Sequence, residues 1–226
     1  MAETETETDM QDICTFCAEV GTAPGANLFY EIGISAPGSR DYILEETPSF
    51  VVVPCIGALV DTYVLVISKR HVLSTGWLTA VERTELRQVL AHWSGRIANS
   101  GVSPVIFEHG SYNFRDKGGA CYDHCHAHVL GTDRSPATFV EQVREDIPLA
   151  ASDDWLSSAQ SAIEVGGHSY LAVSSEGGDY IGNSASAPSQ FFRRHLARWL
   201  EADEGVWDWL VFPEVTRVKK MIAQLA

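Results

Sequence analysis

Basic residues are scarce in this sequence. Sixteen lysine and arginine residues stand against 30 aspartate and glutamate residues, and the formal net charge is −14. Nucleic acids and anionic membranes bind to cationic surfaces, so neither is expected as a partner. A small phosphorylated ligand in a local pocket stays compatible with this charge.

Long apolar runs are also missing, since no stretch approaches the roughly 18 to 20 residues that cross a bilayer. The first ten residues are acidic and polar, unlike an export signal, and we expect 1–10 to be a disordered tail. Cysteines are few and odd in number, at five, which does not indicate a disulfide framework. These features predict a soluble protein of the reducing cytoplasm.

What the chain does contain is a run of three histidines at every second position, in the stretch His124-Cys125-His126-Ala127-His128-Val129-Leu130. On a strand, side chains two residues apart share a face, so the three imidazoles would project together while the residues between them point into a core. A half-buried strand that merely carries polar residues would explain one histidine. Three in strict alternation favour catalysis or metal binding.

The apolar pattern along the chain predicts an α+β domain with an antiparallel sheet of about five strands and packed helices. Strands are expected at residues 49–53, 62–68, 105–108 and 169–174 beside the histidine strand, and helices at residues 77–99, 136–145, 153–165, 190–201 and 214–225. Residues 177–188 are expected to form a loop. We expect a catalytic domain over 11–132, with 133–226 as a C-terminal helical extension packed on it.

The helix expected at 77–99 is amphipathic. Its apolar stripe is formed by Leu78, Val81, Leu86, Val89, Leu90, Trp93 and Ile97.

Two cysteines separated by two residues, in Cys14-Thr15-Phe16-Cys17, have the spacing that begins many structural zinc sites. Zinc takes four tetrahedral ligands, so two histidines would have to complete the set. The candidates are His71, just after an expected strand, and one member of the histidine run. Free thiols in a small core are the alternative.

Aligned imidazoles also suit phosphoryl or nucleotidyl transfer. A neutral imidazole is a nucleophile near pH 7, and its phosphoramidate divides one hard displacement into two easier ones. Neighbouring groups would then stabilise the phosphate oxygens and help the leaving group.

Together, these motifs resemble the histidine triad (HIT) superfamily of nucleotide hydrolases and transferases. The resemblance is carried by His124-x-His126-x-His128-Val129-Leu130, by Cys14-Thr15-Phe16-Cys17, by residues 62–71 with their Lys69-Arg70-His71 end, and by Phe107-Glu108-His109-Gly110 with Cys121-Tyr122-Asp123-His124. It covers residues 12–132, whereas 133–226 is only loosely similar to extensions in one bacterial subgroup.

The resemblance implies a role for each histidine of the run. His126 would attack the α-phosphorus, and His128 would contact the phosphate and help the leaving group. As in the zinc-containing members, a structural zinc would be bound by Cys14, Cys17, His71 and His124.

Three positions depart from the family pattern. His128 stands where the transferase and phosphorylase branches have glutamine, which favours hydrolysis. Pro54 stands where family hydrolases carry an acid that binds the ribose hydroxyls, so the ligand is expected to be held by its phosphate or leaving group. Cys121 replaces a small hydroxyl residue near the phosphate.

Further contacts with substrate are expected from Glu108, His109, Gly119, Cys121 and Arg193. Glu108 and His109 would line the pocket at a strand end, although a buried pair that shapes the turn explains them as well. The guanidinium of Arg193 matches a phosphate oxygen, with a solvated helix face as the alternative.

The sequence therefore predicts a nucleotide hydrolase, or phosphoramidase, that cleaves a P–O or P–N bond at the α-phosphate through a nucleotidyl-histidine. One alternative is a nucleotidyltransferase, or a specialised biosynthetic or resistance enzyme, acting on an unusual phosphoramidate or nucleotide conjugate. Another is a non-catalytic ligand-binding module. Many relatives are two-fold dimers, so the resemblance also allows a homodimer.

Overall fold

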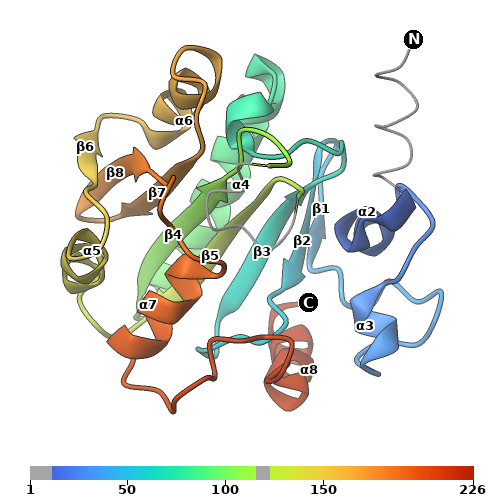
Figure 1. The fold of residues 1–226 in the computed structure, drawn as a ribbon. Helices are drawn as coiled ribbons and strands as arrows, with labels where there is room; N and C mark the ends of the chain where they lie inside the picture. The colour runs from blue at the N-terminus through green and yellow to red at the C-terminus, as the bar shows by residue number, and fades with distance from the viewer. Residues whose placement is uncertain (1–11, 116–122) are drawn as a thin grey trace, which may run out of the picture.

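An eight-stranded, wholly antiparallel sheet runs through the residues that the computed structural model describes, which are 12–115 and 123–226 (Figure 1). In spatial order the strands are β1 (Glu45–Glu46), β2 (Phe50–Pro54), β3 (Tyr63–Ser68), β5 (His126–Thr132), β4 (Ser103–Gly110), β7 (Tyr170–Ser175), β8 (Gly178–Asn183) and β6 (Ala150–Ser152). The α+β class with an antiparallel sheet is thereby confirmed. The expected tail 1–10 and the candidates Gly119 and Cys121 lie outside the described residues.

The sheet has more strands than the five or so expected. The loop expected at 177–188 is wrong over 178–183, because these residues form β8, which pairs with β7 on one side and with β6 on the other. A two-residue turn joins β7 to β8, since Ser175 pairs with Gly178. Residues 133–226 thus add strands to the sheet as well as helices.

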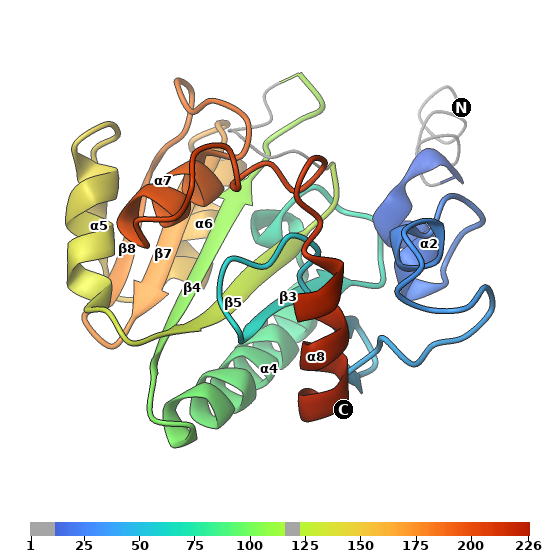
Figure 2. The same ribbon diagram turned by 90° about the horizontal axis from the view of Figure 1, so that it is seen from below.

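Helices cover both faces of the sheet (Figures 1 and 2). One core lies between the sheet and α4 and α6, and the other lies between the sheet and α2, α3, α5, α7 and α8. The helices are α2 (Thr15–Val20), α3 (Leu28–Glu31), α4 (Ala80–Asn99), α5 (Pro136–Arg144), α6 (Trp155–Glu164), α7 (Phe191–Trp199) and α8 (Val215–Leu225), with a 3-10 helix at Thr75–Trp77. None of the helices in the described ranges combines the length and the hydropathy that a membrane crossing requires.

The helix expected at 77–99 begins at Ala80, because Thr79 and Glu82 form a capping box. The expected stripe is buried except at one position, since 76% of Val81 is exposed. Val81 lies five residues before Leu86, and at about 100° per residue its side chain points well away from the buried face.

The histidine run lies on the central strand β5, between β3 and β4. Ala127 and Val129 pack into the core with α4 and α6, whereas His126 and His128 share the opposite face with Leu130. The expected alternation is confirmed for these residues, while His124 lies two residues before the strand begins.

Candidate functional site

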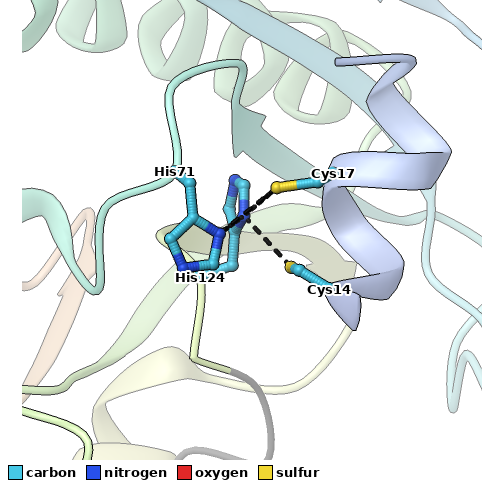
Figure 3. Close-up of side chains that lie close together, drawn as sticks. All are labelled: Cys14, Cys17, His71 and His124. Carbon is cyan, nitrogen blue, oxygen red and sulfur yellow. Dashed lines mark hydrogen bonds between the residues drawn. The ribbon is translucent and has the colours of Figure 1, made fainter. Parts of the chain in front are cut away.

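Four side chains from three separate parts of the chain meet beside the ends of the interior strands β3 and β5 (Figure 3). Cys14 and Cys17 lie at the start of α2, His71 follows β3 and His124 precedes β5. Two backbone hydrogen bonds continue the pairing of β3 and β5 past the strand ends, from the Ser68 amide to the Cys125 carbonyl and from the Cys125 amide to the Val72 carbonyl. This pairing brings the two histidines together.

The spacing of the ligand atoms fits a tetrahedral metal ion. A tetrahedral zinc ion has bonds of about 2.3 Å to sulfur and about 2.0 to 2.1 Å to nitrogen. Its sulfur and nitrogen ligands are then about 3.5 Å apart, and two nitrogen ligands are about 3.3 Å apart. His124 Nδ1 lies 3.4 Å from Cys14 Sγ and 3.5 Å from Cys17 Sγ, and His71 Nδ1 lies 3.2 Å from Cys17 Sγ and 3.2 Å from His124 Nδ1. The four ligand atoms all lie within 4.8 Å of one another.

The surroundings orient the ligand atoms. His124 Nε2 lies 2.7 Å from the Ser68 carbonyl oxygen, so the ring proton is on Nε2 and the Nδ1 lone pair faces the cysteines. The contact with Cys17 and the two imidazoles lower the pKa of the Cys14 thiol, which favours the thiolate that metals bind. The structure therefore brings together a Cys₂His₂ set that could hold a metal ion.

His126 presents one free ring nitrogen. Its Nδ1 lies 2.7 Å from the His124 carbonyl oxygen, which can only accept, so the proton is on Nδ1 and the Nε2 lone pair is available. Only 4% of the residue is exposed. The Phe16 ring packs edge-on against the imidazole, with a centroid distance of 4.9 Å.

His128 lies beside His126, with the two ring centroids 5.0 Å apart. Its ring stacks on Phe107 at 4.5 Å, and its Nδ1 lies 2.9 Å from the Tyr63 hydroxyl oxygen. Burial raises the pKa of Tyr63 well above its usual range, so the hydroxyl stays protonated and can donate to Nδ1. Donation from Tyr63 would leave the ring proton of His128 on Nε2. No pattern in the sequence indicates this role for Tyr63.

Burial also sets the charge of the two imidazoles. It lowers the pKa of His126 to about 4 and that of His128 well below its usual value. Both rings are therefore neutral near pH 7, as a nitrogen nucleophile and a hydrogen-bond donor require.

Both histidines line a small cavity that opens to solvent, with about 430 Å³ of empty space when its open mouth is included. Its wall is mostly apolar and comes from α2, α3, the end of β2 and the segment around α7. The lining residues are Phe16, Glu19, Leu28, Phe29, Val53, Pro54, Cys55, Ile56, Leu65, His126, His128, Arg193 and Trp209. Pro54, noted in the sequence as a departure, is among them.

Arg193 lies in this cavity wall and not on a solvated helix face, since only 3% of it is exposed. Its guanidinium donates to the Gly57 carbonyl at 2.7 Å and to the Trp207 carbonyl at 2.8 Å. Among the described residues, no carboxylate lies within ion-pair distance of it. Arg193 is therefore a fixed, buried cation beside the two histidines.

The two residues expected at the strand end lie on opposite faces of β4. His109 is buried, and its Nε2 accepts a hydrogen bond from the Phe192 amide at 3.1 Å. Glu108 accepts from the Thr75 amide and hydroxyl and from the Tyr170 hydroxyl, at 2.8, 2.5 and 2.6 Å. Neither residue lines the cavity, so their contact with substrate stays a prediction.

The Glu108 network makes stability depend on pH. Burial raises the pKa of Glu108 from 4.5 to about 7. Between these values the unfolded chain releases a proton that the native state retains, so the free energy of unfolding falls as pH rises and levels off above about 7. At about 1.4 kcal/mol per pKa unit the loss is on the order of 3 kcal/mol.

The variant Glu108→Gln can retain the three hydrogen bonds without this titration. We expect the free energy of unfolding of the variant, minus that of the wild type, to be about 3 kcal/mol larger at pH 8 than at pH 4.5. Denaturant unfolding at the two pH values measures this difference. A difference that stays constant across this range would contradict the assignment.

Sequence reasoning also missed a carboxyl group in the cavity wall. Glu19 lies on α2, with only 2% of its surface exposed, and burial raises its pKa to about 8. It is three residues after Phe16 and so shares a helix face with a residue that packs on His126. This spacing is the one signal by which the sequence could have indicated it.

Comparison with known proteins gives structural matches only. No protein-family model and no curated protein matches the sequence. An HIT family hydrolase from Clostridium thermocellum matches at 19% identity and a TM-score of 0.35, over 54% of this chain and 94% of that one. A HIT-like protein matches at 18% identity and a TM-score of 0.35, over 48% of this chain and 100% of that one. The yeast Ap4A phosphorylase, in complex with Ap4A, matches at 11% identity and a TM-score of 0.34, over 80% of this chain and 82% of that one.

Proposed function

We propose that this chain is a HIT-type nucleotide hydrolase that cleaves a P–O or P–N bond at the α-phosphate of a nucleotide conjugate. The observation that carries the proposal is the free Nε2 of His126 in a cavity shared with His128 and Arg193. A nucleophile, a hydrogen-bond donor and a fixed cation are the groups that displacement at a phosphate requires.

The reaction has two steps. In the first, His126 Nε2 forms a bond to the α-phosphorus while the bond from phosphorus to the leaving oxygen or nitrogen breaks. The leaving group departs with a proton taken up directly from solvent. In the second step water attacks the phosphorus, the N–P bond breaks, and the nucleoside monophosphate leaves. The attacking water releases one proton to solvent, which balances the proton taken up in the first step, and His126 is neutral again.

The surrounding groups act on the phosphate. The Nε2 proton of His128 donates to a non-bridging oxygen, and Arg193 supplies the positive charge that the transition state needs. Its three polar contacts hold it in position, so little reorganisation is required as negative charge develops. Histidine rather than glutamine at position 128 favours water as the acceptor over transfer to a second substrate.

We further propose that zinc is the metal of the Cys₂His₂ set, bound by Cys14, Cys17, His71 and His124. Thiolate and imidazole ligands at tetrahedral spacing suit zinc, and four protein ligands close its coordination shell. Its contribution is structural, because it ties α2, which carries part of the cavity wall, to the ends of β3 and β5.

Trapping the intermediate tests the proposal directly. The protein is mixed with a nucleoside 5′-phosphoramidate, quenched at alkaline pH, which preserves an N–P bond, and digested for mass spectrometry. We expect the nucleotidyl mass on the peptide containing His126 and release of the nucleoside monophosphate. A label on another residue, or turnover with no adduct at rapid quench times, would contradict the mechanism. Binding without any turnover would favour a non-catalytic module, and transfer to an added acceptor would favour a transferase.

A further inference from the structure

Cys14 and Cys17 are two thiols that lie close enough to react with each other. Their sulfur atoms belong to the four ligand atoms that all lie within 4.8 Å of one another, and both side chains extend from the start of α2 toward the same two histidines (Figure 3). Residues three apart in a helical turn have Cα atoms about 5 Å apart. A disulfide spans Cα distances of about 4.4 to 6.8 Å, so the pair can close by side-chain rotation while α2 stays helical.

Cys14 is the thiol that an oxidant in solution reaches first. Among the described residues it is half-buried, whereas Cys17, Cys55 and Cys125 are buried. A cysteine that binds a metal or lies beside an imidazole is held as the thiolate, which is the form that peroxides oxidise. Oxidation should therefore begin at Cys14, with Cys17 as the thiol that completes the disulfide.

A disulfide would remove both sulfur ligands from the metal set. His71 and His124 would remain, and two imidazoles alone bind zinc far more weakly than a closed set of four ligands. The other end of α2 has a separate attachment, since the Tyr42 hydroxyl donates to the Glu19 carbonyl at 2.6 Å. The loss of anchoring would therefore fall on the start of the helix.

Phe16 connects the start of α2 to the cavity. It lies between the two cysteines and lines the cavity, and its ring packs against the imidazoles of His126 and His124 at centroid distances of 4.9 and 5.8 Å. Once the metal no longer holds the start of α2, the ring loses its fixed position against both histidines. The cavity wall and the packing on His126 therefore depend on the oxidation state of the two sulfurs.

We propose that Cys14 and Cys17 are a redox switch, in which a peroxide oxidises the pair to a disulfide, the metal is released and the cavity is disabled until the disulfide is reduced. This inference rests on the metal and the nucleotide cavity of the proposed function. With hydrogen peroxide, the Cys14 thiolate attacks one oxygen, the O–O bond breaks and hydroxide leaves, which makes Cys14 a sulfenic acid. The Cys17 thiolate then attacks the Cys14 sulfur, the S–S bond forms, the S–O bond breaks and a second hydroxide leaves. The two sulfurs lose two electrons and the peroxide gains them.

Metal release and mass spectrometry test the switch without any substrate. Zinc-loaded wild type is treated with hydrogen peroxide, released zinc is followed with a colorimetric chelator, and the protein is digested without reduction. We expect zinc release in step with the loss of two hydrogen atoms from the peptide that carries Cys14 and Cys17. A phosphine reductant with added zinc should restore both the mass and the metal content.

Calorimetry with nucleoside 5′-monophosphates links the switch to the cavity. We expect oxidation to weaken binding by about tenfold or more, and reduction with added zinc to restore it. Cys125→Ala is the matched control and should release zinc at the wild-type rate, because Cys125 lies in the core with α4 and α6 and is only 1% exposed. Cys55→Ala removes the thiol in the cavity wall, and it too should release zinc at the wild-type rate.

Several outcomes would overturn the inference. They are retention of zinc in excess peroxide, sulfinic acid on Cys14 without a disulfide, and a disulfide that involves another cysteine. Unchanged nucleotide affinity after zinc release would also overturn it, as would a reduced protein that holds no zinc or binds no monophosphate. An adduct on His126 of the reduced protein would in each case leave the proposed hydrolase intact.

Discussion

Replacing His126 with alanine is expected to reduce hydrolysis of a nucleoside 5′-phosphoramidate by about a thousandfold or more, while the fold and the metal remain. Nε2 of this ring is the atom that would bond to phosphorus, whereas the Nδ1 of His128 is occupied by its contact with the Tyr63 hydroxyl. The substitution also removes the hydrogen bond to the His124 carbonyl and leaves a small cavity. We expect a loss of stability of about 1 to 3 kcal/mol, too little to unfold the chain.

The measurements are kcat/KM for the phosphoramidate, metal content and circular dichroism. His92→Ala is the matched control, because the His92 side chain is 56% exposed on α4, away from the cavity. This substitution should leave kcat/KM, metal content and circular dichroism unchanged. His128→Gln should reduce the rate less than His126→Ala, since the nucleophile remains. Substantial hydrolysis by His126→Ala, at native metal content, would rule out the covalent mechanism.

The sequence predicted those elements that their own residues mark. Residues 62–68 are rich in β-branched and aromatic residues, and they form β3 within one residue of the expected bounds. The helix after residue 79 follows its apolar stripe. By contrast, β8 carries glycine and polar residues and is half exposed, so no apolar alternation marks it. Its pairing with β7 and β6 makes it a strand, and pairing depends on residues distant in sequence.

The candidate site also combines residues that a local pattern marks with residues that depend on distant parts of the chain. The two cysteines and the histidine run have short, chemically meaningful spacings, and the structure brings Cys14, Cys17, His71 and His124 together. Arg193 could be noted only as one of two adjacent arginines. Its burial depends on the carbonyl of Gly57, 136 positions away in the sequence. Tyr63 likewise acquires its surroundings only when distant segments meet, and Glu19 is marked by nothing but its spacing from Phe16.

Removal of the metal is expected to have the second large effect. Cys14→Ser should abolish tight zinc binding, because hydroxyl is a poor replacement for thiolate among the four ligands. Metal binding at such a site contributes directly to folding free energy, so we expect a loss of several kcal/mol in stability. The loss should concentrate in α2, which carries two of the four ligands, and in α3, which packs against α2, and amide hydrogen exchange should rise there first.

The effect should also reach the cavity, because α2 carries the lining residues Phe16 and Glu19 between and just after the two cysteines. Chelated wild type and Cys14→Ser should therefore bind nucleoside monophosphates more weakly, although no metal ligand lines the cavity. Cys125→Ala is the matched control, since Cys125 is buried in the core against α4 and α6 and should keep the metal. If Cys14→Ser retained one tightly bound zinc, or if chelation left both melting temperature and exchange of α2 unchanged, the assigned ligand set would be wrong. The cavity wall would then have to be held by packing alone.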